Sequence, residues 1–169
     1  MSLRRIYAII LRFLYHFRHS LDRVMDMFYW PVVDLVLWGL TSLYFSSLAP
    51  ETPSVIFAIV AGILFWAVVY RGQAEVSMNI LEDLWTRNLV NIFISPLTFA
   101  EWITAFMFVG IIKSILTFSF AALVAYFLFS IHVTFFGWYL LPFIFLLIMN
   151  GWWIGFIVGA LILRFGTRI

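Results

Sequence analysis

Four long apolar segments, separated by short polar ones, most constrain what this chain can fold into. A helix needs about 20 mostly apolar residues to cross the hydrocarbon core of a bilayer. Four segments approach or exceed that length, at 28–48, 54–71, 99–129 and 135–163. Only 11% of the 169 residues are charged, against about a quarter in soluble domains. The sequence therefore predicts an all-α, polytopic protein with four transmembrane helices.

The positions of the arginines predict the orientation of these spans. Nine of the ten Lys and Arg residues lie before the first segment, between the second and third, or after the fourth. Because cytoplasmic loops carry the excess of Lys and Arg, we expect the N-terminus, the loop 71–101 and the C-terminal end in the cytoplasm. The cations are scattered and form no basic patch, so nucleic acid is not an expected partner. The chain has no cysteine, which excludes disulfides and thiol chemistry.

Residues 2–27 carry five arginines, too many for a membrane span, but have helical periodicity. One stripe is apolar (Ile6, Ile10, Phe13, Phe17, Leu21, Val24), and arginines and histidines lie roughly opposite. This pattern predicts an amphipathic helix in the membrane interface, with its apolar face toward the lipid. Two roles remain open for it, a surface anchor and a sliding lever on the first span.

Residues 76–95 interrupt the apolar pattern between the second and third spans. Apolar residues recur on one helical face (Met78, Leu81, Trp85, Leu89, Ile92), and charged residues lie off that face. Pro96 ends this helix, and Thr98 with Glu101 matches the capping box that begins a new one. The sequence thus predicts a cytoplasmic helix, a turn and the third span. This helix is either interfacial without a partner or a docking element for a soluble protein.

A few polar and small residues lie inside the predicted spans. Gly151, Gly155 and Gly159 share one helical face, a spacing that favours close helix packing. Asp34 and Lys113 lie in different spans, and we predict that they form an ion pair, since intramembrane charges usually have partners. The three histidines have no spacing typical of a metal site, so no metal is expected.

Three stretches resemble the permease subunit of a bacterial type-2 ATP-binding-cassette (ABC) exporter. They are "FYWPVVDLVLWGL" in the first span, "RGQAEVSMNILEDLWTRNLVNIFISPLTFAEW" in the loop, and "GWWIGFIVGALILRFG" in the fourth span. The resemblance covers essentially the whole chain as one permease membrane domain. It implies a multi-pass protein of the bacterial inner membrane, which works as a homodimer or paired permease.

The resemblance also implies that the loop carries a coupling helix that docks on a nucleotide-binding ATPase subunit. The residues expected to couple are Glu82, Asp83, Trp85, Arg87 and Asn88. The chain has no phosphate-binding G-x-x-x-x-G-K-[ST] loop, so ATP and magnesium belong to the partner, and this chain is expected to bind no cofactor and to be no enzyme. Such permeases usually have six spans, which makes a C-terminally truncated fragment the expectation. The alternative function is a four-span membrane scaffold or assembly protein without transport activity.

Overall fold

The computed structural model describes residues 2–48 and 55–166, and all regular structure in these ranges is helical. The elements are α1 (Leu3–His19), α2 (Leu21–Leu48), α3 (Val55–Trp85), α4 (Leu89–Ile94), α5 (Phe99–Phe129), the 3₁₀ helix η1 (Val133–Tyr139) and α6 (Leu140–Phe165). Within the described residues, four helical segments are long and apolar enough to cross a membrane: 21–48, 56–85, 99–129 and 136–165. The predicted all-α class with four such segments is confirmed.

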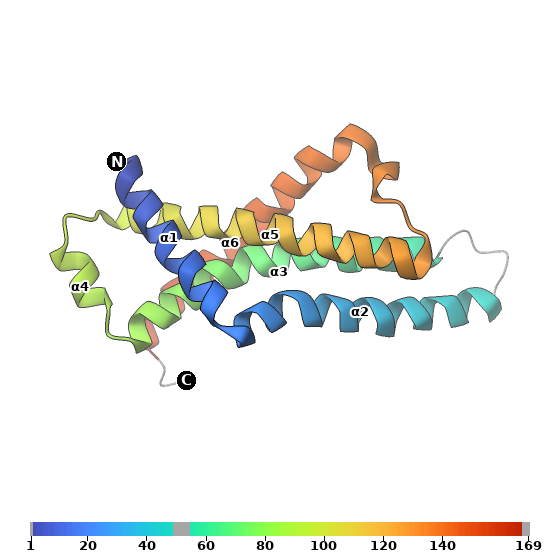
Figure 1. Cartoon of the computed structure of the whole chain (residues 1–169), viewed down its shortest axis with the longest axis horizontal. Coiled ribbons are helices and arrows are strands. Elements are labelled where there is room, and N and C mark those ends of the chain that lie inside the picture. The colour runs from blue at the N-terminus through green and yellow to red at the C-terminus, as the bar shows by residue number, and fades with distance from the viewer. Residues whose placement is uncertain (1, 49–54, 167–169) are drawn as a thin grey trace.

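The four long helices do not lie in one simple parallel array. In Figure 1, α2, α3 and α5 run along the long axis of the molecule, and α6 crosses at an angle. The main partner of α6 is α3, which also packs against α5 and α2. Helix α3 is therefore the central helix. The end of the bundle that carries α1 and α4 also carries the N-terminus, at the left of Figure 1; we call it the polar end.

The predicted interfacial helix 2–27 is divided in the structure. Ser20 has an extended backbone, with φ −110° and ψ 102°, and the first span helix already begins at Leu21. The prediction that the apolar face of this segment meets lipid was wrong for α1. Ile6, Ile9 and Phe13 are buried in one cluster with residues of α3 and α5, and the Phe13 and Phe106 rings meet edge to face at 5.1 Å. Packing against protein replaces contact with lipid.

The second span and the predicted cytoplasmic helix form one continuous helix, so the separate elements 54–71 and 76–95 were wrong. Between Arg71 and Trp85 no proline interrupts the helix, and a single glycine there costs only about 1 kcal/mol. The helix stops at Arg87, which adopts a left-handed conformation with φ 53°. The Arg87 N–H donates to the Leu84 carbonyl at 3.1 Å and the Asn88 N–H donates to the Asp83 carbonyl at 3.0 Å. This pair of bonds is a Schellman helix end.

The predicted start of α5 is confirmed in its atomic detail. The Glu101 N–H donates to Thr98 Oγ1 at 3.4 Å, and the Thr98 N–H donates to Glu101 Oε2 at 3.1 Å. Both bonds of the capping box are thus present, and α5 spans Phe99–Phe129, as expected. In the fourth predicted segment, 135–163, regular α-helix begins only at Leu140. Gly137 precedes it with φ 55° and ψ −146°, a conformation that is essentially restricted to glycine.

The glycine face of α6 lies directly on α3. A Cβ atom added to Gly151 would lie 2.6 Å from the Val69 carbonyl oxygen, and one added to Gly155 would lie 2.8 Å from the Gln73 carbonyl oxygen. At Gly159 the nearest atom is Ile80 Cδ1, at 2.6 Å. The structure therefore places the small residues where the two helices approach most closely, as helix packing requires.

Replacement of these glycines by alanine tests the helix contact. We expect Gly151→Ala and Gly155→Ala each to lower the free energy of unfolding by about 1–3 kcal/mol, because the added methyl group overlaps backbone atoms. The matched control is Gly62→Ala, where nothing lies within 4 Å of the added Cβ, and it should leave the stability equal or raise it by up to about 1 kcal/mol. Unfolding in mixed detergent micelles measures all three; equal effects at Gly151 and Gly62 would contradict the packing.

Candidate functional site

A row of buried polar side chains on α3 organises the polar end. Arg71, Glu75, Asn79 and Asp83 follow one another at four-residue spacing, which places them on one face of the helix. All four are buried, and Asp83 is completely so. We call this set the polar stripe. Buried polar groups need partners, and the partners come from α1, α2 and α5.

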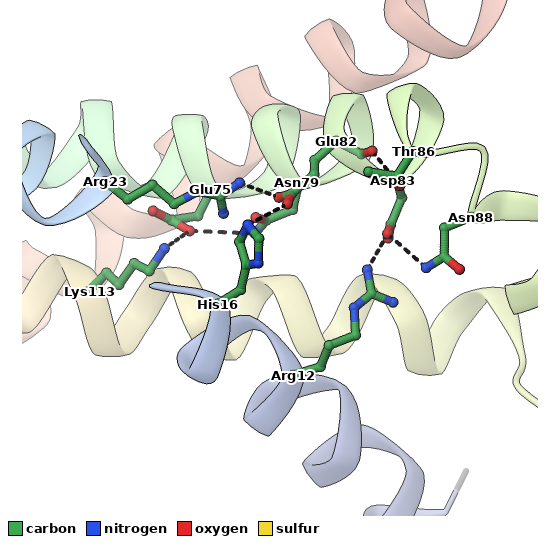
Figure 2. A network of polar contacts seen from close by, with 10 residues as sticks. All are labelled: Arg12, His16, Arg23, Glu75, Asn79, Glu82, Asp83, Thr86, Asn88 and Lys113. Atoms are coloured by element: carbon green, nitrogen blue, oxygen red, sulfur yellow. Dashed lines mark hydrogen bonds and ion pairs between the residues drawn. The ribbon is translucent and has the colours of Figure 1, made fainter. Parts of the chain in front are cut away.

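Asp83, at the end of the stripe, joins three elements. Arg12 of α1 forms an ion pair with Asp83 Oδ1, and the Trp102 indole N–H of α5 donates to Asp83 Oδ2 at 3.0 Å. The Asn88 amide also donates to Oδ1, at 3.3 Å. Figure 2 shows the Arg12 and Asn88 side chains converging on this carboxylate. Asp83 therefore fixes α1 and α5 to the last turn of α3.

Glu75 holds the middle of the stripe. Lys113 Nζ of α5 lies 2.7 Å from Glu75 Oε2 (Figure 2), and the Asn79 amide donates to the same oxygen at 3.4 Å. Arg71 Nη1 lies 3.8 Å from Glu75 Oε1. The same guanidinium donates to Asp26 Oδ2 of α2 at 2.9 Å. These bonds connect α2, α3 and α5 in one polar layer.

Two further carboxylates tie the N-terminal helices to this end. Glu82 lies 2.6 Å from Arg23 Nη2 and 3.1 Å from His16 Nε2; both contacts are drawn in Figure 2. Glu101, at the start of α5, accepts the Ser2 backbone N–H at 2.6 Å. We call the polar stripe and Glu82, together with their partners on α1, α2 and α5, the polar clamp.

The predicted ion pair between Asp34 and Lys113 was wrong. Lys113 faces the polar stripe and pairs with Glu75, and its ammonium also lies 4.7 Å from the centre of the Phe17 ring. Asp34 instead lines a cavity between α2 and α3. The pairing follows from which face of α5 meets α3, a property of the folded bundle that the separate span sequences do not contain.

The five predicted coupling residues differ in how far their side chains are exposed. Asp83 and Glu82 are engaged in the polar clamp and do not extend from the surface as docking charges. Trp85 is 64% exposed, and Arg87 is exposed at the helix end. Asn88 begins the short turn to α4 and is half-buried. Of the five, Trp85 and Arg87 are the residues whose side chains are free to contact another protein.

Along residues 76–95, Met78 and Trp85 of the apolar stripe are exposed, whereas the polar residues Asn79 and Asp83 are buried. The pattern of a soluble amphipathic helix is inverted here, because Asp83 finds its partners on α1 and α5, inside the bundle. The four-residue spacing of the polar stripe is the sequence signal that could have revealed this.

The segment between α3 and α5 forms the tip of the polar end. It runs from Trp85 to Phe99 through α4, and it stands beyond the other helices at the left of Figure 1. Exposed apolar side chains line it: Trp85, Val90, Ile94 and Phe99. On the inner side Ile92 is buried in the same cluster as Ile9 and Trp102. The tip is therefore packed on the bundle and presents apolar groups outward.

Among residues 2–48 and 55–166, no group of three or more His, Asp or Glu side chains is placed to hold a metal ion. Comparisons with protein-family models, with curated proteins and with solved structures find no match.

A double-mutant cycle tests the revised ion pair. Lys113→Met alone removes the nearer of the two cations at Glu75 and leaves only Arg71, at 3.8 Å. We expect a loss of about 3–5 kcal/mol in the free energy of unfolding. Glu75→Leu combined with Lys113→Met should cost clearly less than the two single changes added together. The matched cycle with Asp34→Asn and Lys113→Met should be additive within about 0.5 kcal/mol, as for independent sites. Coupling at Asp34 and additivity at Glu75 would contradict the assignment.

Proposed function

We propose that this chain is a permease subunit of an ATP-driven exporter of the type-2 ABC kind. One observation carries the proposal: the tip is fixed at both ends to long helices. The Schellman end at Arg87 closes α3, and the capping box at Thr98 opens α5. A partner that pushes on the tip would therefore displace two span helices directly, with no flexible loop to absorb the movement.

The polar clamp supports the same role. Through Asp83, the last turn of α3 is bound to Arg12 of α1 and to Trp102 of α5. A displacement of the tip would thus reach α1 as well, which fits the lever role left open for the N-terminal helix. The exposed apolar side chains of the tip fit a partner with a cleft, since aromatic and apolar anchors dominate binding energy at interfaces.

The remaining parts of the proposal come from the sequence. The resemblance to the permease family supplies the ATPase partner, which would hold ATP and magnesium, and the pairing of two permease subunits. The arginine distribution supports a cytoplasmic polar end in the bacterial inner membrane.

Co-purification with a candidate ATPase tests the docking role. We expect Trp85→Ala, and Trp85→Ala combined with Arg87→Gly, to reduce recovery of the ATPase at least about tenfold, the effect of losing about 1.4 kcal/mol. Arg87→Gly is preferred to alanine because glycine adopts the left-handed backbone without strain. The control is Trp153→Ala, which removes an equally exposed tryptophan on α6 and should leave recovery unchanged.

Two outcomes would contradict the exporter proposal. Recovery that is unaffected by both tip variants would remove the tip as the docking site. Stable association of the tip with a soluble protein that lacks a nucleotide-binding site would instead favour the membrane scaffold, because that role also requires a docking surface but no motor.

Cysteine labelling tests the orientation, and the absence of native cysteine makes each introduced thiol unique. On intact cells, a membrane-impermeant maleimide should label His132→Cys, an exposed position between α5 and η1. Thr86→Cys at the tip should react only after the cells are permeabilised. The reverse pattern would place the tip outside the cell and would overturn the coupling role.

A further inference from the structure

A groove runs along the contact between α2 and α3, and it begins at the polar clamp, since Arg71, Glu75 and Lys113 line its first cavity. Three adjoining cavities form it. The cavity nearest the polar end has about 450 Å³, the middle one about 210 Å³ and the third about 320 Å³. Asp26 and Arg71 line both of the first two cavities, and Asp34 with Trp66 lines both of the last two.

The middle cavity contains a carboxylate without a cation. Arg71 at one end is neutralised by Asp26 at 2.9 Å and lies 3.8 Å from Glu75. Asp34, at the junction with the third cavity, has no ion pair or side-chain hydrogen bond with any other described residue. A charged group inside a span is costly and normally has a partner. The charge left over in this cavity is therefore negative.

Aromatic side chains line the same cavity as this carboxylate. Trp30 of α2 and both Trp66 and Tyr70 of α3 line the middle cavity. The faces of tryptophan and tyrosine rings attract cations, and aromatic groups around a carboxylate recognise alkylammonium ligands. A phosphate or carboxylate ligand would be repelled by Asp34 and would gain nothing from the ring faces.

A second and independent observation points to a ligand in this cavity. Thr117 of α5 lines it and is only 1% exposed, yet Thr117 Oγ1 has no hydrogen-bond partner among the described residues. Buried hydroxyl groups almost always have a hydrogen-bond partner.

The third cavity is apolar by comparison with the middle one, with Trp38, Ile59 and Ile63 among its lining residues.

We infer that the groove binds an amphiphile with a quaternary ammonium head group. The ammonium lies at Asp34, in the cavity that the three aromatic side chains line, with Thr117 available to a neighbouring polar atom of the head group. The alkyl chain follows the third cavity. The volumes agree with this division. The middle cavity is below the roughly 300–1,000 Å³ of a pocket for a whole drug-sized molecule, so it holds a head group, and the adjoining cavity takes the chain. The site goes beyond the exporter proposal and stands without it.

Binding of radiolabelled dodecyltrimethylammonium to the purified chain in maltoside micelles tests the site. We expect saturable binding, which Asp34→Asn weakens at least about tenfold and Trp66→Leu weakens several-fold. Two matched controls should bind as the unchanged protein does. Asp22→Asn removes the same charge at the start of α2, where Asp22 lines the first cavity but neither of the two cavities that hold the ligand. Trp153→Leu removes a tryptophan that is 69% exposed, against 62% for Trp66, on α6 outside the groove.

Competition experiments separate the chemical alternatives. Dodecyl phosphate should compete at least about tenfold less well than unlabelled dodecyltrimethylammonium. The opposite order would overturn the inference. It would favour an anionic ligand at Arg71, whose buried Nε has no acceptor among the described residues. If phosphatidylcholine competes, the ammonium head group comes from a bilayer lipid. If it does not compete, the ligand is a free amphiphile. Both results agree with the proposed site. Equal weakening by Asp34→Asn and Asp22→Asn would indicate a nonspecific charge effect and overturn the inference. Because no ATPase is present, this result is independent of the co-purification.

Discussion

The ion pair between Lys113 and Glu75 is the interaction on which the polar end of the bundle depends. It belongs to a chain of alternating charges, Asp26–Arg71–Glu75–Lys113. A separate pair, Arg12 with Asp83, lies further along the same face of α3. Removing one member leaves a buried charge without its partner, which costs about 3–5 kcal/mol, although replacing a whole pair by apolar groups is often neutral. The charges are therefore better explained by the position they give to α1, α2 and α5 on α3 than by net stability.

The location of this polar layer determines how the bundle is divided. On one side, Ile6, Phe13 and Trp102 belong to a cluster that joins α1, the end of α3, α4 and the start of α5. On the other, Leu35, Leu64 and Ala121 belong to the cluster that joins the spans. The tip and α1 are thus packed in the same unit. A force on the tip would meet a packed unit that is continuous with the spans through α3 and α5, and through Trp152 of α6, which packs against both clusters.

The sequence predicted the elements that depend on local rules and missed those that depend on neighbours. The start of α5 at Phe99 followed from Thr98 and Glu101, whose capping bonds need no other part of the chain. The length of α3 was missed, because a drop in hydropathy after Tyr70 was interpreted as the end of a helix. Hydropathy reports the surroundings of a side chain, whereas helix ends are set by caps and by residues such as Arg87. The partner of Lys113 could not be predicted either, since four carboxylates lie in or near the first two spans and only the packing of α5 on α3 selects Glu75.

Polar groups that have partners and polar groups that lack them lie at different places in the bundle, and this contrast separates structure from ligand binding. The carboxylates of Glu75 and Asp83 on α3 have a cation within reach, and Arg71 pairs with Asp26 of α2. Asp34 of α2 and the Thr117 hydroxyl of α5 share a cavity and have no partner among the described residues. Asp34 and Thr117 lie beside a cavity lined by aromatic side chains. Their missing partner is therefore expected to be a ligand from outside the chain.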